Sequence, residues 1–267
     1  MSAKRSYSSD LSNARKRIKQ GNAITPTASI SLTESELLKF IPNNTNDAIN
    51  HLFGLFPSNQ QLNLPPIIYL HQLYNFSNLN RTQIDKDIIQ LKQENKIKVF
   101  KFETKSEYAC LCYTDSLVNY FKSLLNSNEE SNYNEILPIV IDKFYKRPTE
   151  VSIRKNELLN ECKLKDSVIT KLIQNGFLTI KDENEYWHSV PNIVLFIKLI
   201  HEARKLITFI ISKKKYKEIT INELKDRNFK KLRILGILYH CYDLIGSDIV
   251  QRVESPMSLT IRLNRDE

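Results

Sequence analysis

The chain has 267 residues, of which 41% are hydrophobic and 26% are charged, a composition typical of a globular protein that buries its own core. No apolar run approaches the roughly 18 residues of a membrane span, and no apolar stretch follows the charged N-terminal residues. We therefore expect an intracellular protein with neither a secretory signal nor a membrane partner. The four cysteines, Cys110, Cys112, Cys162 and Cys241, form no C-x-x-C pair. Buried core thiols are expected rather than disulfides or a metal site.

Positive charge is concentrated in two segments of the chain. The formal net charge is +9, and residues 1–22 carry a net +5 while residues 192–240 carry a net +8, so the remainder carries −4. A local excess of this size predicts a basic surface patch that binds a polyanion, rather than a protein that is basic all over.

Residues 1–45 are rich in Ser, Asn, Thr and Lys and poor in large apolar residues, which predicts a disordered basic arm. Within the arm, two basic clusters separated by nine residues indicate a bipartite nuclear import signal. The cations of these clusters are Lys4, Arg5, Arg15, Lys16, Arg17 and Lys19. A basic arm that contacts nucleic acid is the alternative interpretation, and the two roles are compatible.

The first globular segment, residues 46–128, shows helical periodicity and then a β-hairpin pattern. Its third helix is expected to begin after Asn80, with Gln83 completing a capping box. The predicted elements are helices at 47–56, 65–74 and from 81 onward, followed by strands at 97–103 and 108–114. Three helices closed by a hairpin are typical of a winged helix.

A similar order recurs in residues 129–191 and again in residues 192–267. In the second segment we predict helices at 134–146, 156–162 and 165–176, with strands at 151–155, 177–181 and 186–190. In the third we predict a helix of about twenty residues after Pro191, helices at 222–226 and 232–245, and strands at 218–221, 248–253 and 258–263. Gly176 is expected to end one helix, and Trp187 to pack in the core. The predicted fold is mainly α with small β-hairpins (α+β), as three tandem winged-helix domains.

The third winged helix carries the strongest candidates for DNA contact. Its lysines precede the first strand and recur at the start of the predicted helix 232–245, where cations oppose the helix dipole. The candidate residues are Lys213, Lys214, Lys215, Lys217, Lys230, Lys231 and Arg233, with weaker candidates Arg154, Lys155 and Arg81 in the other two segments. Because lysine predominates over Asn and Gln, we expect contacts to the DNA backbone with little sequence preference.

Several stretches, in the same order, resemble the serine/threonine-protein kinase 19 family across residues 46–267. They are HQLY (71–74), RTQID (81–85), NGFLTI (175–180), FIK (196–198), KYKE (215–218) and YHCYDLIG (239–246). The resemblance implies a nuclear protein of tandem winged helices that binds double-stranded DNA and chromatin. It also implies a non-catalytic role in transcription-coupled nucleotide excision repair, beside stalled RNA polymerase.

The residues do not support kinase activity, in spite of the family's name. The five glycines form no G-x-G-x-x-G loop, and neither an H-R-D nor a D-F-G motif occurs. His71 and His240 lie in apolar helical patterns and are expected to be hydrogen-bonded core histidines. We therefore predict no catalytic site, cofactor, metal or small-molecule substrate. The alternatives are a protein-interaction scaffold for transcription and repair complexes and, with the least support, an atypical protein kinase.

Overall fold

The computed structural model describes residues 40–57, 62–101, 109–126, 136–145, 151–254 and 259–264. All of these belong to one unit of the chain, residues 34–267. The predicted import signal lies outside the described residues, as do residues 1–39 of the arm predicted at 1–45 and the tips of the first and third hairpins. Residues 40–45 of that arm are described: Phe40 stacks on His51, and Thr45 is buried at the start of the first helix.

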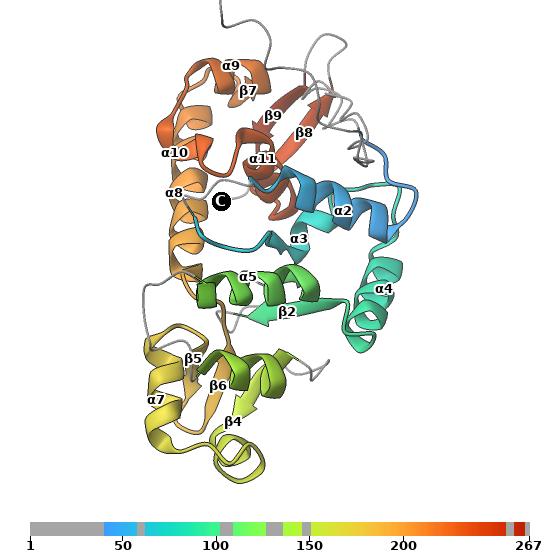
Figure 1. The fold of residues 1–267 in the computed structure, drawn as a ribbon. Helices are drawn as coiled ribbons and strands as arrows, with labels where there is room; N and C mark the ends of the chain where they lie inside the picture. Colours follow the sequence, from blue (N-terminus) through green and yellow to red (C-terminus); the bar gives the residue numbers. More distant parts are fainter. Residues whose placement is uncertain are drawn as a thin grey trace, which may run out of the picture. The chain divides into compact units, whose positions relative to one another are not determined.

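Three small antiparallel sheets organise the described chain (Figure 1). Each consists of a hairpin to which one short strand from earlier in the sequence is added, giving the orders β1-β3-β2, β4-β6-β5 and β7-β9-β8. The strands are β1 Ile68–Tyr69, β2 Ile97–Lys101, β3 Ala109–Tyr113, β4 Ser152–Arg154, β5 Leu178–Asp182, β6 Glu185–His188, β7 Glu218–Thr220, β8 Val250–Glu254 and β9 Leu259–Leu263. The predicted α+β class is confirmed, and the arrangement is compatible with tandem winged helices.

Helices make up most of the remaining described chain. They are α2 Thr45–Leu55, α3 Leu70–Leu73, α4 Arg81–Gln93, α5 Thr114–Asn126, α7 Asp166–Gln174, α8 Ile193–Ser212, α9 Ile221–Asp226, α10 Lys230–Arg233 and α11 Ile237–Gly246. Two π-helical segments, η2 Val140–Tyr145 and η3 Glu157–Glu161, lie within the helices predicted at 134–146 and 156–162. The amphipathic helix α5 has no counterpart among the predicted elements.

The helix predicted at 65–74 is wrong over its first half. Ile68 and Tyr69 pair with Leu111 and Cys110 of β3, so the helix is confined to the single turn α3. A proline ring at position 66 cannot donate a backbone hydrogen bond, and the β-branched and aromatic residues that follow favour an extended backbone. The strand β1 therefore forms where a helix was expected.

The helix predicted at 232–245 is confirmed from Ile237 onward, but it is interrupted at Gly236. The φ and ψ angles of Gly236 are +86° and 146°, outside the helical region, and they separate α10 from α11. Lys230, Lys231 and Arg233 therefore occupy a short helix of their own. These cations therefore do not oppose the dipole of a long helix, as was expected of them.

Of the residues predicted at helix ends, Asn80 and Gly176 are confirmed, whereas the capping box predicted at Gln83 is wrong. Asn80 caps α4, since its Oδ1 accepts a hydrogen bond from the backbone N–H of Thr82 at 2.9 Å. Gln83 does not complete a capping box, because its side-chain amide donates to Asp87 Oδ1 at 2.7 Å. Gly176 follows α7 with φ +76°, as expected of a glycine after a helix C-terminus.

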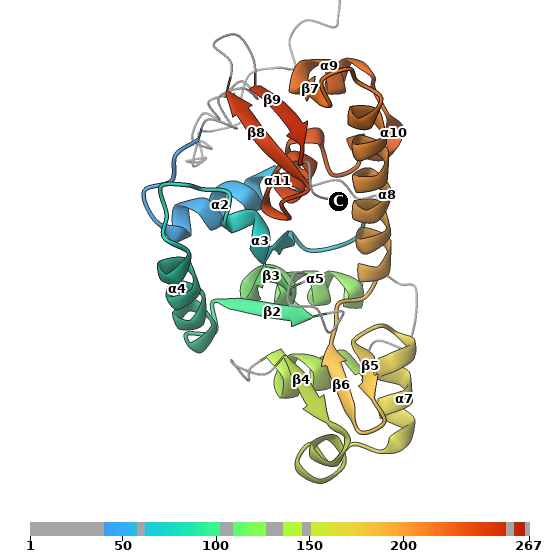
Figure 2. The ribbon, with the colours of Figure 1, turned by 180° about the vertical axis from the view of Figure 1, so that it is seen from behind.

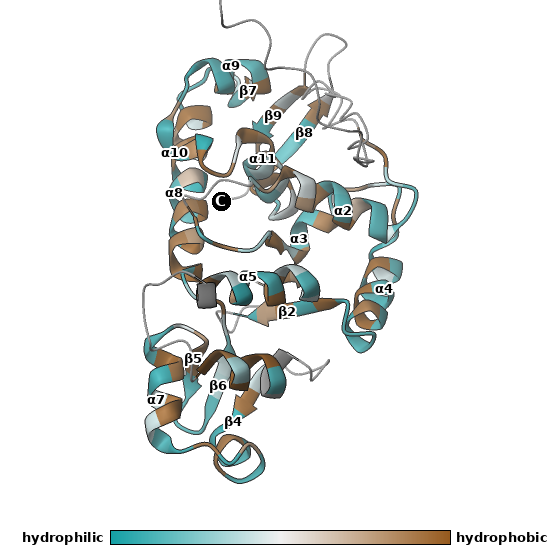
Figure 3. Ribbon diagram, in the orientation of Figure 1, coloured by the Kyte–Doolittle hydropathy of each residue, from teal (hydrophilic) through white to brown (hydrophobic). Residues whose placement is uncertain are grey.

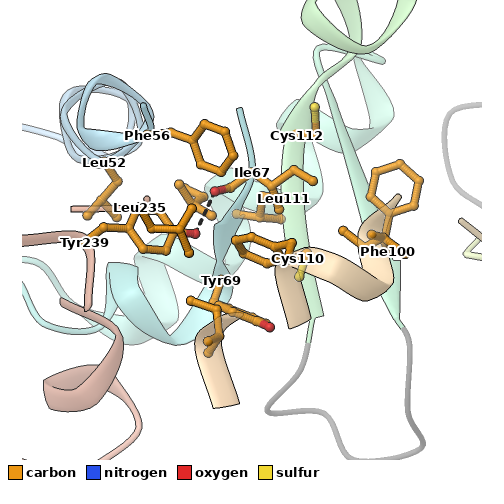
Figure 4. Packing of buried hydrophobic residues seen from close by; sticks show 14 of the residues in the cluster. Leu52, Phe56, Ile67, Tyr69, Phe100, Cys110, Leu111, Cys112, Leu235 and Tyr239 are labelled. Carbon is orange, nitrogen blue, oxygen red and sulfur yellow. Dashed lines mark hydrogen bonds between the residues drawn. The ribbon is translucent and has the colours of Figure 1, made fainter. Parts of the chain in front are cut away.

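The first and third sheets are joined by a shared apolar core. Tyr239 of α11 belongs to the same buried cluster as Ile67, Cys110 and Leu111 of the first segment, and its hydroxyl donates to the Ile67 carbonyl at 2.7 Å (Figure 4). All four cysteines are buried as thiols, which confirms the prediction of core thiols. Trp187 corrects one expectation: it is only half-buried and carries the Lys181 ammonium 4.6 Å above its ring.

Helix α8 connects the second sheet to the third. Figures 1 and 2 show it running alongside α10 and α11, and it contacts both helices as well as β7 and β9. Apolar residues recur along its length (Figure 3), and those at its buried face include Phe196, Ile200, Ala203, Ile207 and Ile211. The opposite face of α8 is left exposed.

Candidate nucleic-acid interface

The predicted lysine run 213–217 forms the turn that leaves α8. Lys213 is the C-terminal cap of this helix, and the Lys217 amide donates to the Lys214 carbonyl at 3.1 Å, which closes the turn. The Lys217 carbonyl then accepts a hydrogen bond from the Leu263 amide of β9 at 3.0 Å. The run is therefore held at both ends by backbone contacts.

The lysines of this run differ in their partners. Lys214 forms an ion pair with Glu223 of α9, which also accepts a hydrogen bond from Arg227 at 2.9 Å. These two hydrogen bonds lower the pKa of Glu223. Lys213, Lys215 and Lys217 are exposed, and no carboxylate among the described residues forms an ion pair with them. Three of the four predicted lysines thus present their charge to solvent.

The second predicted cluster lies on α10, which packs against α8. Lys231 pairs with Glu202 of α8 at 2.8 Å, while Lys230 and Arg233 are exposed. The hydrogen bond from Lys231 lowers the pKa of Glu202, and the charges of Lys198 and Lys205 lower it further. Three lysines therefore surround one carboxylate and leave an excess of positive charge.

Lys198 and Lys205 are functional candidates that the sequence prediction missed. On α8 the positions 198, 202, 205, 209 and 213 are spaced by three or four residues, so they follow one another along a single side of the helix. This spacing was the available signal. We call the set formed by this side, the lysine turn and α10 the basic face. Its members are Lys198, Lys205, Lys213, Lys215, Lys217, Lys230, Lys231 and Arg233.

The structure does not bring the weaker candidates into the basic face. Arg154 lies on the edge strand β4. Hydrogen bonds from Lys181 and Ser152 lower the pKa of Glu185, and the charge of Arg154 lowers it further. The Lys155 ammonium nitrogen lies 3.6 Å from Asp166 Oδ1. Figure 1 draws β4 far from β7 and α9. These two cations stay predictions as DNA contacts.

Arg81 is also separate from the basic face, at the start of α4. Its guanidinium lies 4.8 Å from the centre of the Tyr74 ring, and the Tyr74 hydroxyl donates to Asp85 at 2.6 Å. A second acid of α4, Asp87, accepts from Thr45 and Gln83. The exposed side of α4 is thus of mixed charge, as the sequence indicated.

A buried ionic cluster lies between α3, α8 and α11. The Asp243 carboxylate accepts hydrogen bonds from Arg204 Nε and Nη2, both at 2.7 Å, and from His71 Nε2 at 2.8 Å. Burial alone would raise the pKa of Asp243, but these hydrogen bonds and charges lower it to about 2. Since an ionised carboxylate only accepts, His71 carries its proton on Nε2. The expectation of a hydrogen-bonded core histidine is confirmed for His71.

His240 differs from that expectation. It is 1% exposed, and neither ring nitrogen has a hydrogen-bond partner within the described part of the chain. Burial lowers its pKa to about 4; the charge of Asp243 opposes this shift and that of Arg204 adds to it.

The described ranges contain no group of three His, Cys, Asp or Glu residues placed to hold a metal ion. None of the described helices is long and apolar enough to cross a membrane.

Two of the stretches that carried the family resemblance contact each other here. HQLY lies on α3 and YHCYDLIG on α11; Gln72 donates to the Tyr239 carbonyl at 3.2 Å, and Asn75, just after α3, donates to the Tyr242 carbonyl at 2.6 Å. With the His71–Asp243 bond, these contacts form what we call the α3–α11 junction. Its hydrogen bonds hold α3 against α11.

Small sheets on a helical frame define an α+β protein with an exposed basic face and a buried ionic cluster. The chain belongs to the family described as inactive serine-threonine protein kinase 19, whose model matches residues 41–240. It is 26% identical over 231 residues to winged helix repair factor 1 of Homo sapiens, covering 86% of this chain and 89% of the relative. The protein of the same name from Xenopus laevis is 26% identical over 218 residues, covering 81% of this chain and 82% of the relative. The family's description as inactive confirms the prediction that the chain is not a kinase.

Proposed function

We propose that the chain is a nuclear, non-enzymatic winged-helix repair factor that binds double-stranded DNA through the basic face. The observation that carries this proposal is the exposure of Lys213, Lys215 and Lys217 at the end of α8, together with the exposed cations of α10, which packs on the same helix. The names of the relatives, which are repair factors, support it. We further propose that it acts in transcription-coupled nucleotide excision repair, beside stalled RNA polymerase.

The chemistry of the basic face favours phosphates over bases. Seven of its eight members are lysines, which act as point charges, whereas base edges are recognised by bidentate Arg, Asn and Gln. Binding is therefore expected to tolerate changes of DNA sequence and to weaken steeply as salt rises. This is the behaviour required of a factor that meets damage at any position in a gene.

The domain division belongs to the same proposal. We assign residues 46–128, 129–191 and 192–267 to three winged helices, each containing one of the three sheets. Residues 1–45 form a basic arm, in which Lys4, Arg5, Arg15, Lys16, Arg17 and Lys19 direct nuclear import. Replacing these six residues in a fluorescent fusion tests the arm, since it should move the fusion out of the nucleus.

The decisive experiment neutralises the three exposed lysines of the turn. Lys213, Lys215 and Lys217 are each replaced by Gln in the full chain, and duplex binding is measured by fluorescence anisotropy across a salt series. Lys214 is retained because it pairs with Glu223. If each lysine contacts one phosphate, the slope of log K against log salt falls by about 2.7.

The matched control replaces Lys163, Lys165 and Lys171 by Gln, since these are exposed lysines in or beside α7 of the second winged helix. It removes the same charge from another surface, so any effect common to both variants is non-specific. Unchanged affinity and an unchanged salt slope in the first variant contradict the assignment of DNA binding to this turn.

The mixed charge of α4 favours a second candidate function, a protein-interaction surface. Asp85 accepts a hydrogen bond from Tyr74, and Asp87 accepts hydrogen bonds from Thr45 and Gln83. Both acids lie on α4, where a helix that reads DNA would need neutral or positive groups. A triple Gln variant of the lysine turn that still joins the repair complex without binding DNA would support this candidate.

A further inference from the structure

Two aromatic rings stand exposed within the basic face. Phe209, in the last turns of α8, is 60% exposed, and Tyr216, in the lysine turn, is 68% exposed. Contacts with duplex phosphates make no use of an apolar ring. The rings therefore need an explanation that the duplex-binding proposal does not provide.

Each ring carries an ammonium group on its face. Lys213 Nζ lies 5.3 Å from the centre of the Phe209 ring, and Lys215 Nζ lies 5.3 Å from the centre of the Tyr216 ring. A flat apolar surface next to a cation matches the two parts of a nucleotide, which are a base that stacks and a phosphate that is negative. An ammonium that leaves the ring for a phosphate frees the ring face for the base.

The backbone presents both rings in fixed positions. Lys215 and Tyr216 are the two central residues of the turn closed between Lys214 and Lys217, so their side chains lie at its tip. The turn is anchored to β9 by the Lys217 carbonyl, and Phe209 belongs to a continuous helix. Little backbone ordering is then required when a strand binds, which favours affinity.

We propose that Phe209 and Tyr216 are stacking platforms for unpaired bases of a single-stranded polynucleotide. The basic face then prefers nucleic acid in which duplex and unpaired strand adjoin, with the lysines on phosphates and the rings on bases. The duplex part of this inference rests on the proposed function, whereas the binding of unpaired strand rests on the two rings and the ammonium groups beside them. An acidic protein partner would meet the same charges, but it offers no flat base for the rings.

The test uses the full chain with Phe209→Ala, Tyr216→Ala and the double substitution. Anisotropy is measured on a duplex, on the same duplex with an internal unpaired bubble, and on single strands of DNA and of RNA. We expect each Ala substitution to weaken binding to the bubble and to one or both single strands by at least about fivefold. Duplex affinity should change less than twofold.

Two controls accompany these variants. Tyr216→Phe keeps the ring and should bind like the native chain, and Val194→Ala removes an apolar side chain that is 72% exposed at the other end of α8. Because all the substituted side chains are exposed, the thermal unfolding midpoints should match that of the native chain.

The outcomes separate this inference from the proposed function. Equal losses on duplex and bubble, or no loss on any ligand, overturn the stacking platforms. Duplex binding that survives neutralisation of the lysine turn overturns the proposed function but not the platforms, provided that the ring variants lose single-strand binding. Loss of duplex binding in the lysine variant, together with unchanged binding in the ring variants, supports the proposed function and overturns the stacking platforms.

Discussion

Arg204 and Asp243 are joined at two points, since Nε and Nη2 of the arginine each lie 2.7 Å from a different carboxylate oxygen. His71 adds a third hydrogen bond, and the Asp243 side chain has no exposed surface. Among the described residues, the side-chain partners of this carboxylate come from two other helices, α3 and α8. Its position fixes α3, α8 and α11 relative to one another.

Removing Arg204 should destabilise the protein strongly. The substitution Arg204→Met keeps much of the side-chain volume but leaves Asp243 as a buried charge with one partner fewer. We expect the free energy of unfolding to fall by about 3–5 kcal/mol, measured by urea denaturation. The control is Glu218→Gln, which breaks the partly exposed Arg262–Glu218 pair at 2.7 Å and should cost about 1 kcal/mol or less. Equal effects of the two substitutions would contradict a structural role for the cluster.

Gly246 cannot carry a side chain in this fold. A Cβ at this position would lie 2.2 Å from the backbone oxygen of His71, a contact that real structures do not tolerate. Gly246→Ala should separate the α3–α11 junction and lower the thermal unfolding midpoint by several degrees. Gly54→Ala in α2 is the matched control, since nothing lies within 4 Å of its Cβ. It should be neutral or stabilising by up to about 1 kcal/mol. An unchanged midpoint in the Gly246 variant would be inconsistent with the close approach.

Acid should destabilise the fold through His240. Its pKa in the folded state is about 4, below the ordinary value of 6.5, so the unfolded chain binds the proton more readily. The stabilisation is complete above pH 6.5 and is lost as the pH falls from 6.5 towards 4. Between pH 7 and pH 5 this residue should account for about 2 kcal/mol.

The measurement compares urea-unfolding free energies at the two pH values in the native chain, in His240→Leu and in His240→Asn. Both variants lack the titrating ring, although one is apolar and the other polar, so both should show the smaller pH dependence. A difference in stability between the two variants at pH 7 does not affect this comparison. A pH dependence equal to that of the native chain in both variants would rule out His240 as its source.

Lys198 and Lys205 should contribute to duplex binding, although they are distant in sequence from the lysine turn. Replacing both by Gln leaves Glu202 paired with Lys231 and removes two charges from the basic face. We expect the salt slope of duplex binding to fall by about 1.8. A double replacement of Lys165 and Lys171 serves as the control. If only the turn lysines alter the slope, the DNA path does not extend along α8.

Local patterns predicted most of the fold because most elements form from neighbouring residues. The helix α4 and the hairpin β2–β3 follow from apolar spacing, a capping Asn and a change of period. Residues 68–69 were predicted as helix because their partner strand lies some forty residues later, and a pairing of that kind leaves no local signal. The break at Gly236 depends on one residue adopting a positive φ, which the surrounding apolar pattern conceals.

The candidate site was predicted in part for similar reasons. The lysine turn is visible as a charge run, but Lys198 and Lys205 are dispersed among the apolar residues of α8. Their relation to Lys231 exists only because α10 packs on α8. The exposure of Phe209 and Tyr216 likewise depends on how α8 ends, since sequence alone favours burial of aromatic residues.

The α3–α11 junction has a consequence for dissecting this protein into fragments. A fragment that ends at residue 191 would retain His71 and Gln72 but lose their bonds to Asp243 and to the Tyr239 carbonyl, exposing the apolar side of β1 and the ring of Tyr69 to solvent. The complementary fragment would contain Arg204 and Asp243, but the surface around them would be open to solvent. Although the sheets are separate in the sequence, the first and the third are expected to unfold in a single transition. Only the intact chain is then a suitable starting point for measuring what either of them binds.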